Sequence, residues 1–145
     1  MKKYIRYLSL AAGIMTLAFC MSTGDSHPSY LHALDNLAAA RQLIVDNPAD
    51  RATTVNQDTA VFEIDRAVGE IKYACLEVGK NIESHPAMDG APEGVGIYHQ
   101  ALQYLNRARI NVDKDEDYYF AQGLRNHSIN HIDLAIAATL RALVK

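Results

Sequence analysis

The sequence lacks the motifs by which most enzymes and cofactor-binding proteins are recognised. It has no tryptophan and only two cysteines. It contains no Gly-rich phosphate loop, no nucleophile elbow and no H-E-x-x-H motif, and no C-x-x-C-H motif for haem attachment. No stretch alternates polar and apolar residues as a half-buried strand does. The sequence therefore predicts a protein that is not an enzyme, with no catalytic residues and no strands.

Long apolar runs are also scarce, and the longest one lies near the N-terminus. "YLSLAAGIMTLAFCM", residues 7–21, has 15 residues without a charge, whereas a membrane-spanning helix needs about 20. A basic start precedes the run and small residues follow it, a pattern typical of a secretory signal peptide. We predict a signal peptide over residues 1–24, cleaved after Ser22 or Gly24. The alternative is a lipoprotein anchored through Cys20.

Removal of the signal peptide makes the remaining chain acidic. All 17 acidic residues lie at Asp25 or later, and three of the 14 basic residues are lost, so the net charge becomes 11 − 17 = −6. Such a charge argues against nucleic acid and anionic lipid as partners. One cysteine is left, Cys75, which lies on an apolar stripe and is expected to be buried. We expect a periplasmic or secreted protein without a membrane span.

The mature sequence repeats itself at an offset of 68 residues. "YLHALDNLAAAR" (30–41) aligns with "YHQALQYLNRAR" (98–109), and "EIDRAVGEIKYA" (63–74) aligns without a gap with "HIDLAIAATLRA" (131–142). Ten of the 47 aligned pairs are identical. Matching Leu and Ala residues are expected between any two amphipathic helices, so the matched Arg and Asp residues carry more weight. The pattern predicts a duplicated helical hairpin over 28–78 and 96–145, with a connector at 79–95.

Hydrophobic periodicity predicts four helices, at about 28–46, 55–78, 96–113 and 118–143. Thr54 and Gln57 have the spacing of a capping box, which places the start of the second helix at 55. Short connections favour antiparallel neighbours. The predicted fold is therefore all-α, an antiparallel up-down-up-down four-helix bundle formed by residues 25–145.

The repeated arginine lies on the apolar face of its helix and needs a partner. In a hairpin, Arg41 lies about six residues nearer the turn than Asp65, or about 9 Å. Because helical side chains lean toward their own N-terminus, the two approach each other. The repeat predicts the same for Arg109 and Asp133. These residues are expected to form structural ion pairs at the edge of the core, with a polar site in the core as the alternative. Whether each arginine pairs within its hairpin or with the other copy is left open.

Histidine is the residue type with the most suggestive distribution. In an up-down-up-down bundle, His27, His85 and His99 fall at the same end, where they could hold a transition metal ion. The alternative is that these histidines lie at the surface in turns and helix starts. No His lies squarely on a core stripe, as an axial haem ligand would. We expect no cofactor, with a metal- or haem-binding bundle as the alternative.

Two further clusters lie in the last predicted helix. His127 and His131 are four residues apart but lie off the apolar stripe, so we expect a solvent-exposed pair. Tyr118, Tyr119 and Phe120 open the helix. We expect these aromatic residues to form a hydrophobic plug over one end of the bundle, the alternative being an exposed patch for a partner.

Several segments resemble a family of small exported bacterial proteins. "HPSYLHALDNLAAAR", "EIDRAVGEIKYA", "GKNIESHP" and "GLRNHSINHIDLA" are similar to its "HP-x-YLHAL", "EID-x-A", "DGKN" and "HI-x-x-A" segments, over about residues 27–137. The resemblance implies an exported helical bundle and no particular chemistry. Residues 78–81 are "VGKN" where the family pattern has "DGKN", so no role for an acid at position 78 carries over. We therefore expect an exported, non-enzymatic bundle with a binding or envelope-associated role, whose partner is an unidentified protein or small ligand.

Overall fold

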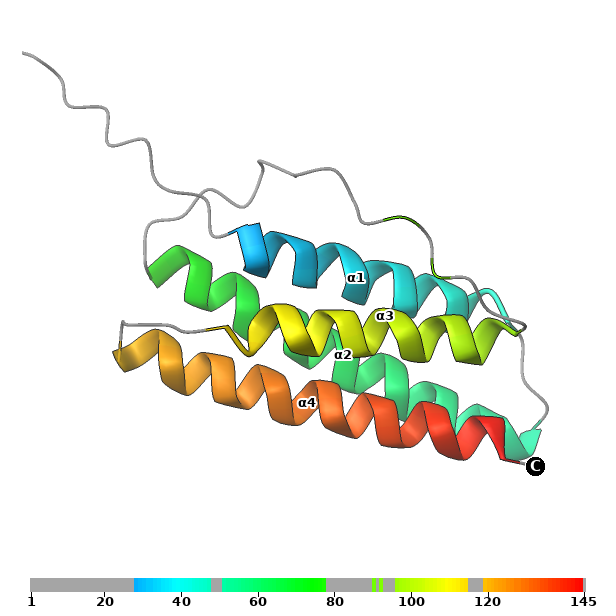
Figure 1. Cartoon of the computed structure of the whole chain (residues 1–145). Coiled ribbons are helices and arrows are strands. Elements are labelled where there is room, and N and C mark those ends of the chain that lie inside the picture. Colours follow the sequence, from blue (N-terminus) through cyan, green and yellow to red (C-terminus); the bar gives the residue numbers. More distant parts are fainter. Residues whose placement is uncertain are drawn as a thin grey trace, which may run out of the picture.

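The protein is a bundle of four α-helices. The computed structural model describes residues 28–47, 51–77, 90, 92, 96–114 and 119–144. The helices are α1 (Pro28–Val45), α2 (Arg51–Glu77), α3 (Ile97–Val112) and α4 (Tyr119–Leu143) (Figure 1). The predicted all-α four-helix bundle is confirmed. The predicted signal peptide and nearly all of the predicted connector lie outside the described residues.

The start of α2 differs from the prediction. This helix begins at Arg51, so Thr54 lies within its first turn and does not precede it. Gln57 makes a different set of contacts from those of a capping box. Its Nε2 lies 2.5 Å from the carbonyl oxygen of Asn47, 2.8 Å from Tyr98 Oη and 3.2 Å from the carbonyl oxygen of Ile44. Gln57 therefore satisfies carbonyl groups that the end of α1 leaves without helical partners.

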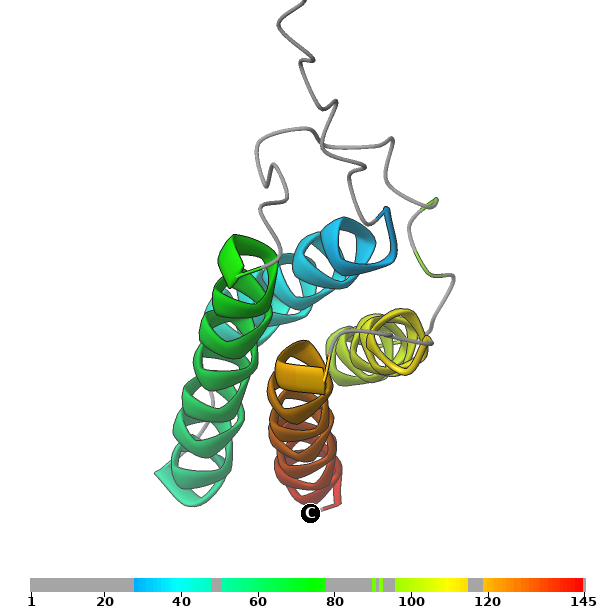
Figure 2. The same cartoon turned by 90° about the vertical axis from the view of Figure 1, so that its left-hand side faces the viewer.

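The helices form a ring in the order α1, α2, α4, α3. The most extensive contacts are those of α2 with α4 and of α1 with α3, and the contacts within each hairpin are smaller. Among the described residues, α1 does not pack against α4, and α2 and α3 do not pack side by side, although the hydrogen bond between Gln57 and Tyr98 joins them at one point. Figure 2, a view along the bundle, shows this arrangement. Most of the core therefore lies between the two hairpins and not inside either of them.

The order of helix directions corrects the up-down-up-down prediction. Tyr98 at the start of α3 contacts Gln57 near the start of α2, and Phe120 at the start of α4 contacts Tyr73 near the end of α2. Thus α3 runs parallel to α2, and the chain order is up-down-down-up (Figure 1). Neighbouring helices in the ring are all antiparallel, as predicted. The end of α2 and the start of α3 therefore lie at opposite ends of the bundle (Figure 1).

The two hairpins are related by an approximate twofold axis perpendicular to the helices. Such an axis exchanges α1 with α3 and α2 with α4, which are the helices equivalent in the sequence repeat. Five pairs of equivalent residues are fully buried: Ala33/Ala101, Leu37/Leu105, Ala40/Ala108, Ile64/Ile132 and Ala67/Ala135. Glu63 and His131, also equivalent, contact each other directly and so lie beside the axis. The repeat in the sequence is therefore a repeat in space.

The burial of Cys75, predicted from its apolar stripe, is confirmed, because only 2 % of this residue is exposed. Its thiol is packed in the core with residues of α2 and its neighbours. Among the described helices, none combines the length and the apolar character required to cross a membrane.

Candidate functional site

The two repeated arginines form ion pairs in equivalent positions. Arg41 Nε lies 2.8 Å from Asp65 Oδ1, and its Nη2 lies 3.2 Å from Oδ2. Arg109 makes the same two contacts with Asp133, at 2.7 and 3.4 Å. Each arginine therefore pairs within its own hairpin, which answers the question that the sequence left open. The pairs connect the helices that share the smaller contacts, α1 with α2 and α3 with α4.

These ion pairs are more exposed than expected. The exposed fractions of the side chains are 41 and 52 % for Arg41 and Asp65, and 39 and 48 % for Arg109 and Asp133. The hydrogen bond to Asp65, and then the attraction of its charge, raises the pKa of Arg41 above its ordinary value, and Asp133 has the same effect on Arg109. Both arginines therefore stay charged. Their geometry suits ion pairs that join neighbouring helices at the surface, and these four residues do not form a polar site in the core.

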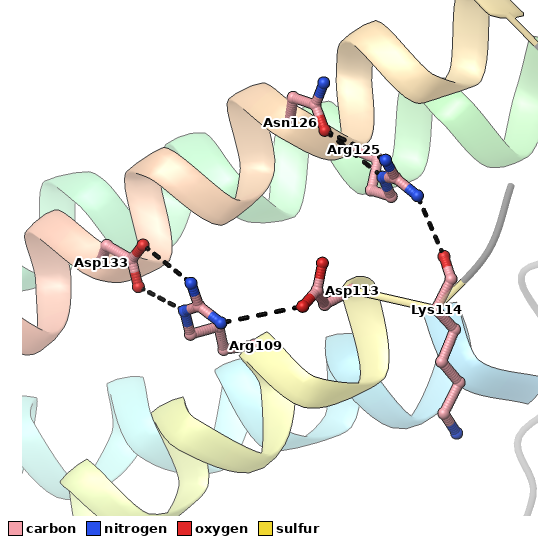
Figure 3. A network of polar contacts seen from close by, with 6 residues as sticks. All are labelled: Arg109, Asp113, Lys114, Arg125, Asn126 and Asp133. Carbon is pink, nitrogen blue, oxygen red and sulfur yellow. Dashed lines mark hydrogen bonds and ion pairs between the residues drawn. The ribbon is translucent and has the colours of Figure 1, made fainter.

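The second pair belongs to a wider network at the turn between α3 and α4 (Figure 3). Arg109 also lies 3.9 Å from Asp113, one turn further along α3. Arg125 on α4 donates to the carbonyl oxygen of Lys114 at 3.3 Å. Arg125 is the repeat equivalent of Gln57, which makes the corresponding contact with the end of α1. In both hairpins, a side chain of the second helix thus donates a hydrogen bond to a carbonyl group just beyond the end of the first helix.

Of the three histidines proposed for a metal site, the structure describes one, His99. His99 is exposed near the start of α3, whereas Pro28, which follows His27, begins α1 at the opposite end (Figure 1). His27 and His85 lie outside the described residues. The placement of the three histidines rested on the up-down-up-down order, which is wrong. In the described part of the chain, no group of three or more His, Cys, Asp or Glu residues is arranged to hold a metal ion.

His131 is in a different environment from the one predicted. His127 is exposed, as expected, but only 18 % of the His131 side chain is exposed. Its Nδ1 lies 2.6 Å from Oε2 of Glu63, whose side chain is 14 % exposed. The contact joins α2 and α4, the helices with the most extensive interface. The sequence alone did not point to this pair, although the offset of 68 residues makes the two positions equivalent.

Tyr119 and Phe120, the described residues of the predicted aromatic plug, do not cover the end of the core. Tyr119 is 86 % exposed and Phe120 is 47 % exposed, while Tyr118 lies outside the described residues. The ring of Phe120 packs edge-on against Tyr73 of α2, with 6.3 Å between ring centroids and an interplanar angle of 65°. The plug was therefore the wrong interpretation, and the structure has the alternative, an exposed aromatic patch. Large aromatic side chains are enriched where proteins bind their partners.

A groove of about 420 Å³ adjoins these rings. Its walls all come from the first turns of α4: Tyr119, Phe120, Gln122, Gly123, Leu124, Asn126 and His127. Gly123 has no side chain and a Cβ added there would meet nothing within 4 Å, so the space over this residue is open. We call these residues the aromatic groove. Its lining combines apolar and aromatic side chains with two amides and one imidazole, a composition that suits binding.

The aromatic groove breaks the symmetry of the molecule. The repeat equivalents of Tyr119, Phe120 and Gly123 are Arg51, Ala52 and Val55, so the first hairpin has no such groove sequence. Comparison of the chain with known proteins finds no matching family model, no similar curated protein and no similar solved structure. The groove is therefore the feature of the molecule that bears most directly on its function.

Proposed function

We propose that this protein is an exported, non-enzymatic helical bundle that binds an apolar segment of a partner polypeptide in the aromatic groove. The observation that carries the proposal is the exposure of Tyr119 and Phe120 beside a glycine. A monomeric protein gains nothing for its own core from an aromatic ring that is 86 % exposed. The two hairpins bury equivalent residues in the core but carry different residues at the groove positions. This difference supports a role of the groove in binding rather than in folding.

The shape and charge of the surface support a polypeptide as the ligand. The groove is open and follows a single helix, so a chain segment can enter with one apolar side chain over Gly123 and continue beyond it. Gln122 and Asn126 line the groove and add polar groups to its walls. The acidic character of the chain after residue 24 favours a segment flanked by basic residues.

The test uses a labelled, unstructured Lys-rich peptide that carries two Phe residues, and the same peptide with Ser in place of Phe. We expect micromolar binding of the first peptide by fluorescence anisotropy and at least tenfold weaker binding of the second. The double variant Tyr119→Ser/Phe120→Ser should lose binding by a similar factor. Ile110→Ser is the matched control, because Ile110 is 64 % exposed on α3, outside the groove.

Two results would overturn the proposed ligand. Equal binding of both peptides would mean that charge alone attracts them. Binding of a small aromatic dye such as anilinonaphthalene sulfonate, without binding of the Phe peptide, would make the ligand a small molecule.

Export is tested separately, by mass spectrometry of the protein recovered from cells. We expect an N-terminus between Thr23 and Ser26. A lipid-modified Cys20 would support the lipoprotein alternative, and a chain retained in the cytoplasm with Met1 would contradict both.

A further inference from the structure

Helix α2 carries an apolar stripe on the face opposite the core. Val55, Phe62 and Leu76 are each at least 60 % exposed. They are spaced by seven and fourteen residues, and Gly69 occupies the position between the last two. At about 100° per residue, these positions fall within an arc of roughly 60°, directly opposite the buried residues of α2. We call Val55, Phe62, Gly69 and Leu76 the α2 stripe. A repeat of seven residues is the spacing at which two helices pair along their length.

The stripe is not a consequence of the sequence repeat. The equivalent positions in α4 are Gly123, Asn130, Ala137 and Val144. Only the last of these is a large apolar residue, whereas three of the four positions in α2 are. The stripe is therefore a property of α2 alone, and no described helix covers it, because α2 packs against α1 and α4 on its other faces.

Gly69 is the second observation that indicates a partner helix. A Cβ at this position would meet nothing within 4 Å, so the packing of this chain does not require a glycine there. Glycine inside a helix is also less favourable than alanine. Its absence of a side chain leaves a hollow of about 390 Å³ beside Asp65, Arg66, Glu70 and Tyr73. Such a hollow can receive a large side chain from a helix that approaches closely.

We propose that the α2 stripe is the interface of a homodimer, in which the α2 helices of two copies pair antiparallel about a twofold axis. With the axis at the level of Asp65 and Arg66, Phe62 of each copy sits over Gly69 of the other. The same register places Val55 opposite Leu76. Phe62 of each copy thus fills the hollow at Gly69 of the other copy. The surface is therefore self-complementary, as a twofold interface must be.

Charges beside the stripe agree with this register. Asp58 and Lys72 are both exposed, and neither takes part in an ion pair among the described residues. In the antiparallel arrangement, Asp58 of one copy lies at the level of Lys72 of the other, on the same side of the seam. A parallel pairing would instead place Asp58 opposite Asp58 and Lys72 opposite Lys72, which like charges disfavour. These two charges therefore favour the antiparallel over the parallel pairing, while Asp65 and Arg66 lie beside their own copies at the axis and add nothing to this preference.

The test is the dissociation constant of the mature protein, measured by sedimentation equilibrium. An interface formed by a single pair of helices buries a small surface area compared with most stable interfaces. We therefore expect a dimer with a micromolar dissociation constant. Phe62→Glu should raise this constant at least a hundredfold. Ile110→Glu, which places the same charge at a similarly exposed position on α3, should leave it unchanged.

Two further variants distinguish the interface from a loss of folding. Gly69→Ala should raise the melting temperature measured at concentrations where the protein is monomeric, yet weaken the dimer at least tenfold. Asp58→Lys and Lys72→Asp should each weaken the dimer, and the double variant should restore it. A monomer at 200 µM, or a dimer that tolerates Phe62→Glu, would overturn the proposal. Neither result depends on the ligand of the aromatic groove, because the α2 stripe and the groove residues are different.

Discussion

Replacing His131 by leucine is the sharpest test of the axis between the hairpins. The substitution removes the partner of Glu63 and leaves its side chain, 14 % exposed, facing an apolar residue. A hydrogen bond to a charged group contributes about 1.5–3 kcal/mol, and breaking a fully buried ion pair costs about 3–5 kcal/mol. Because some solvent reaches both side chains, we expect a loss of about 2 kcal/mol in the free energy of unfolding.

The assay is urea unfolding followed by circular dichroism, which should show a lower midpoint and an unchanged slope. For a domain of this size, the corresponding fall in melting temperature is about 8 °C. Replacing Glu63 by leucine in the same chain should recover most of the loss, because two apolar residues then face each other across the axis. His127→Leu is the control, since this exposed histidine lies one turn earlier on the same helix.

The reasoning is refuted if His131→Leu is no less stable than His127→Leu. It is also refuted if the double variant is less stable than either single one, because the pair would then not act as a unit.

Three further predictions concern the other polar contacts. Arg41→Met and Arg109→Met should each lower the free energy of unfolding by about 0.5–1 kcal/mol, since half-exposed pairs are screened by water, and the two losses should be equal in urea titrations. A loss above about 3 kcal/mol, the value for a buried pair, would contradict the exposure of these pairs. Gln57→Leu should cost about 2 kcal/mol in the same assay, because carbonyl groups at the end of α1 lose their donor; an unchanged midpoint would show that water replaces it. A hydrogen bond to Glu77, and then its charge, raises the pKa of Tyr73, so this contact stabilises the fold at neutral pH and is lost as the pH rises through the raised pKa. Glu77→Gln should therefore shift part of the tyrosinate absorbance to lower pH, and an identical ultraviolet titration would contradict the contact.

Much of the fold follows from local sequence, and this explains which predictions succeeded. Helix positions follow from apolar spacing that each segment carries by itself. The proximity of Arg41 and Asp65 depends only on the hairpin turn between them, so the sequence predicted their approach and the repeat extended it to Arg109 and Asp133. Their exposure was not predictable in this way, because it depends on how far apart α1 and α2 lie.

The order of the helices depends on a distance that the sequence does not specify. The predicted connector has 17 residues, from 79 to 95, and can span at most about 60 Å. Helix α2, with 27 residues, is about 40 Å long. The connector can therefore either turn back at once or run the length of the bundle, and its length does not distinguish the two. The predicted meeting of His99 with the other histidines depended on this choice.

Errors in the aromatic and histidine assignments have the same origin. Tyr119 and Phe120 were expected to cover the end of the core because they are large and apolar, but their exposure follows from the direction in which α4 enters the bundle. His131 lies one residue from the apolar stripe of its helix, at the edge that faces α2. That this edge of α4 is covered becomes clear only once α2 is known to be the neighbouring helix.

The position of Glu63 and His131 beside the axis has a consequence for the ancestry of the chain. If both halves descend from one hairpin that paired with an identical copy, that ancestor had the same residue twice at this place. Two glutamates there would repel each other, and two histidines would do so whenever both carried a proton. Fusion into one gene allowed the two positions to mutate independently, so that an acid and a base could face each other. Residues away from the axis did not contact the same residue of the other copy, so repulsion between identical side chains gave selection no reason to make them different.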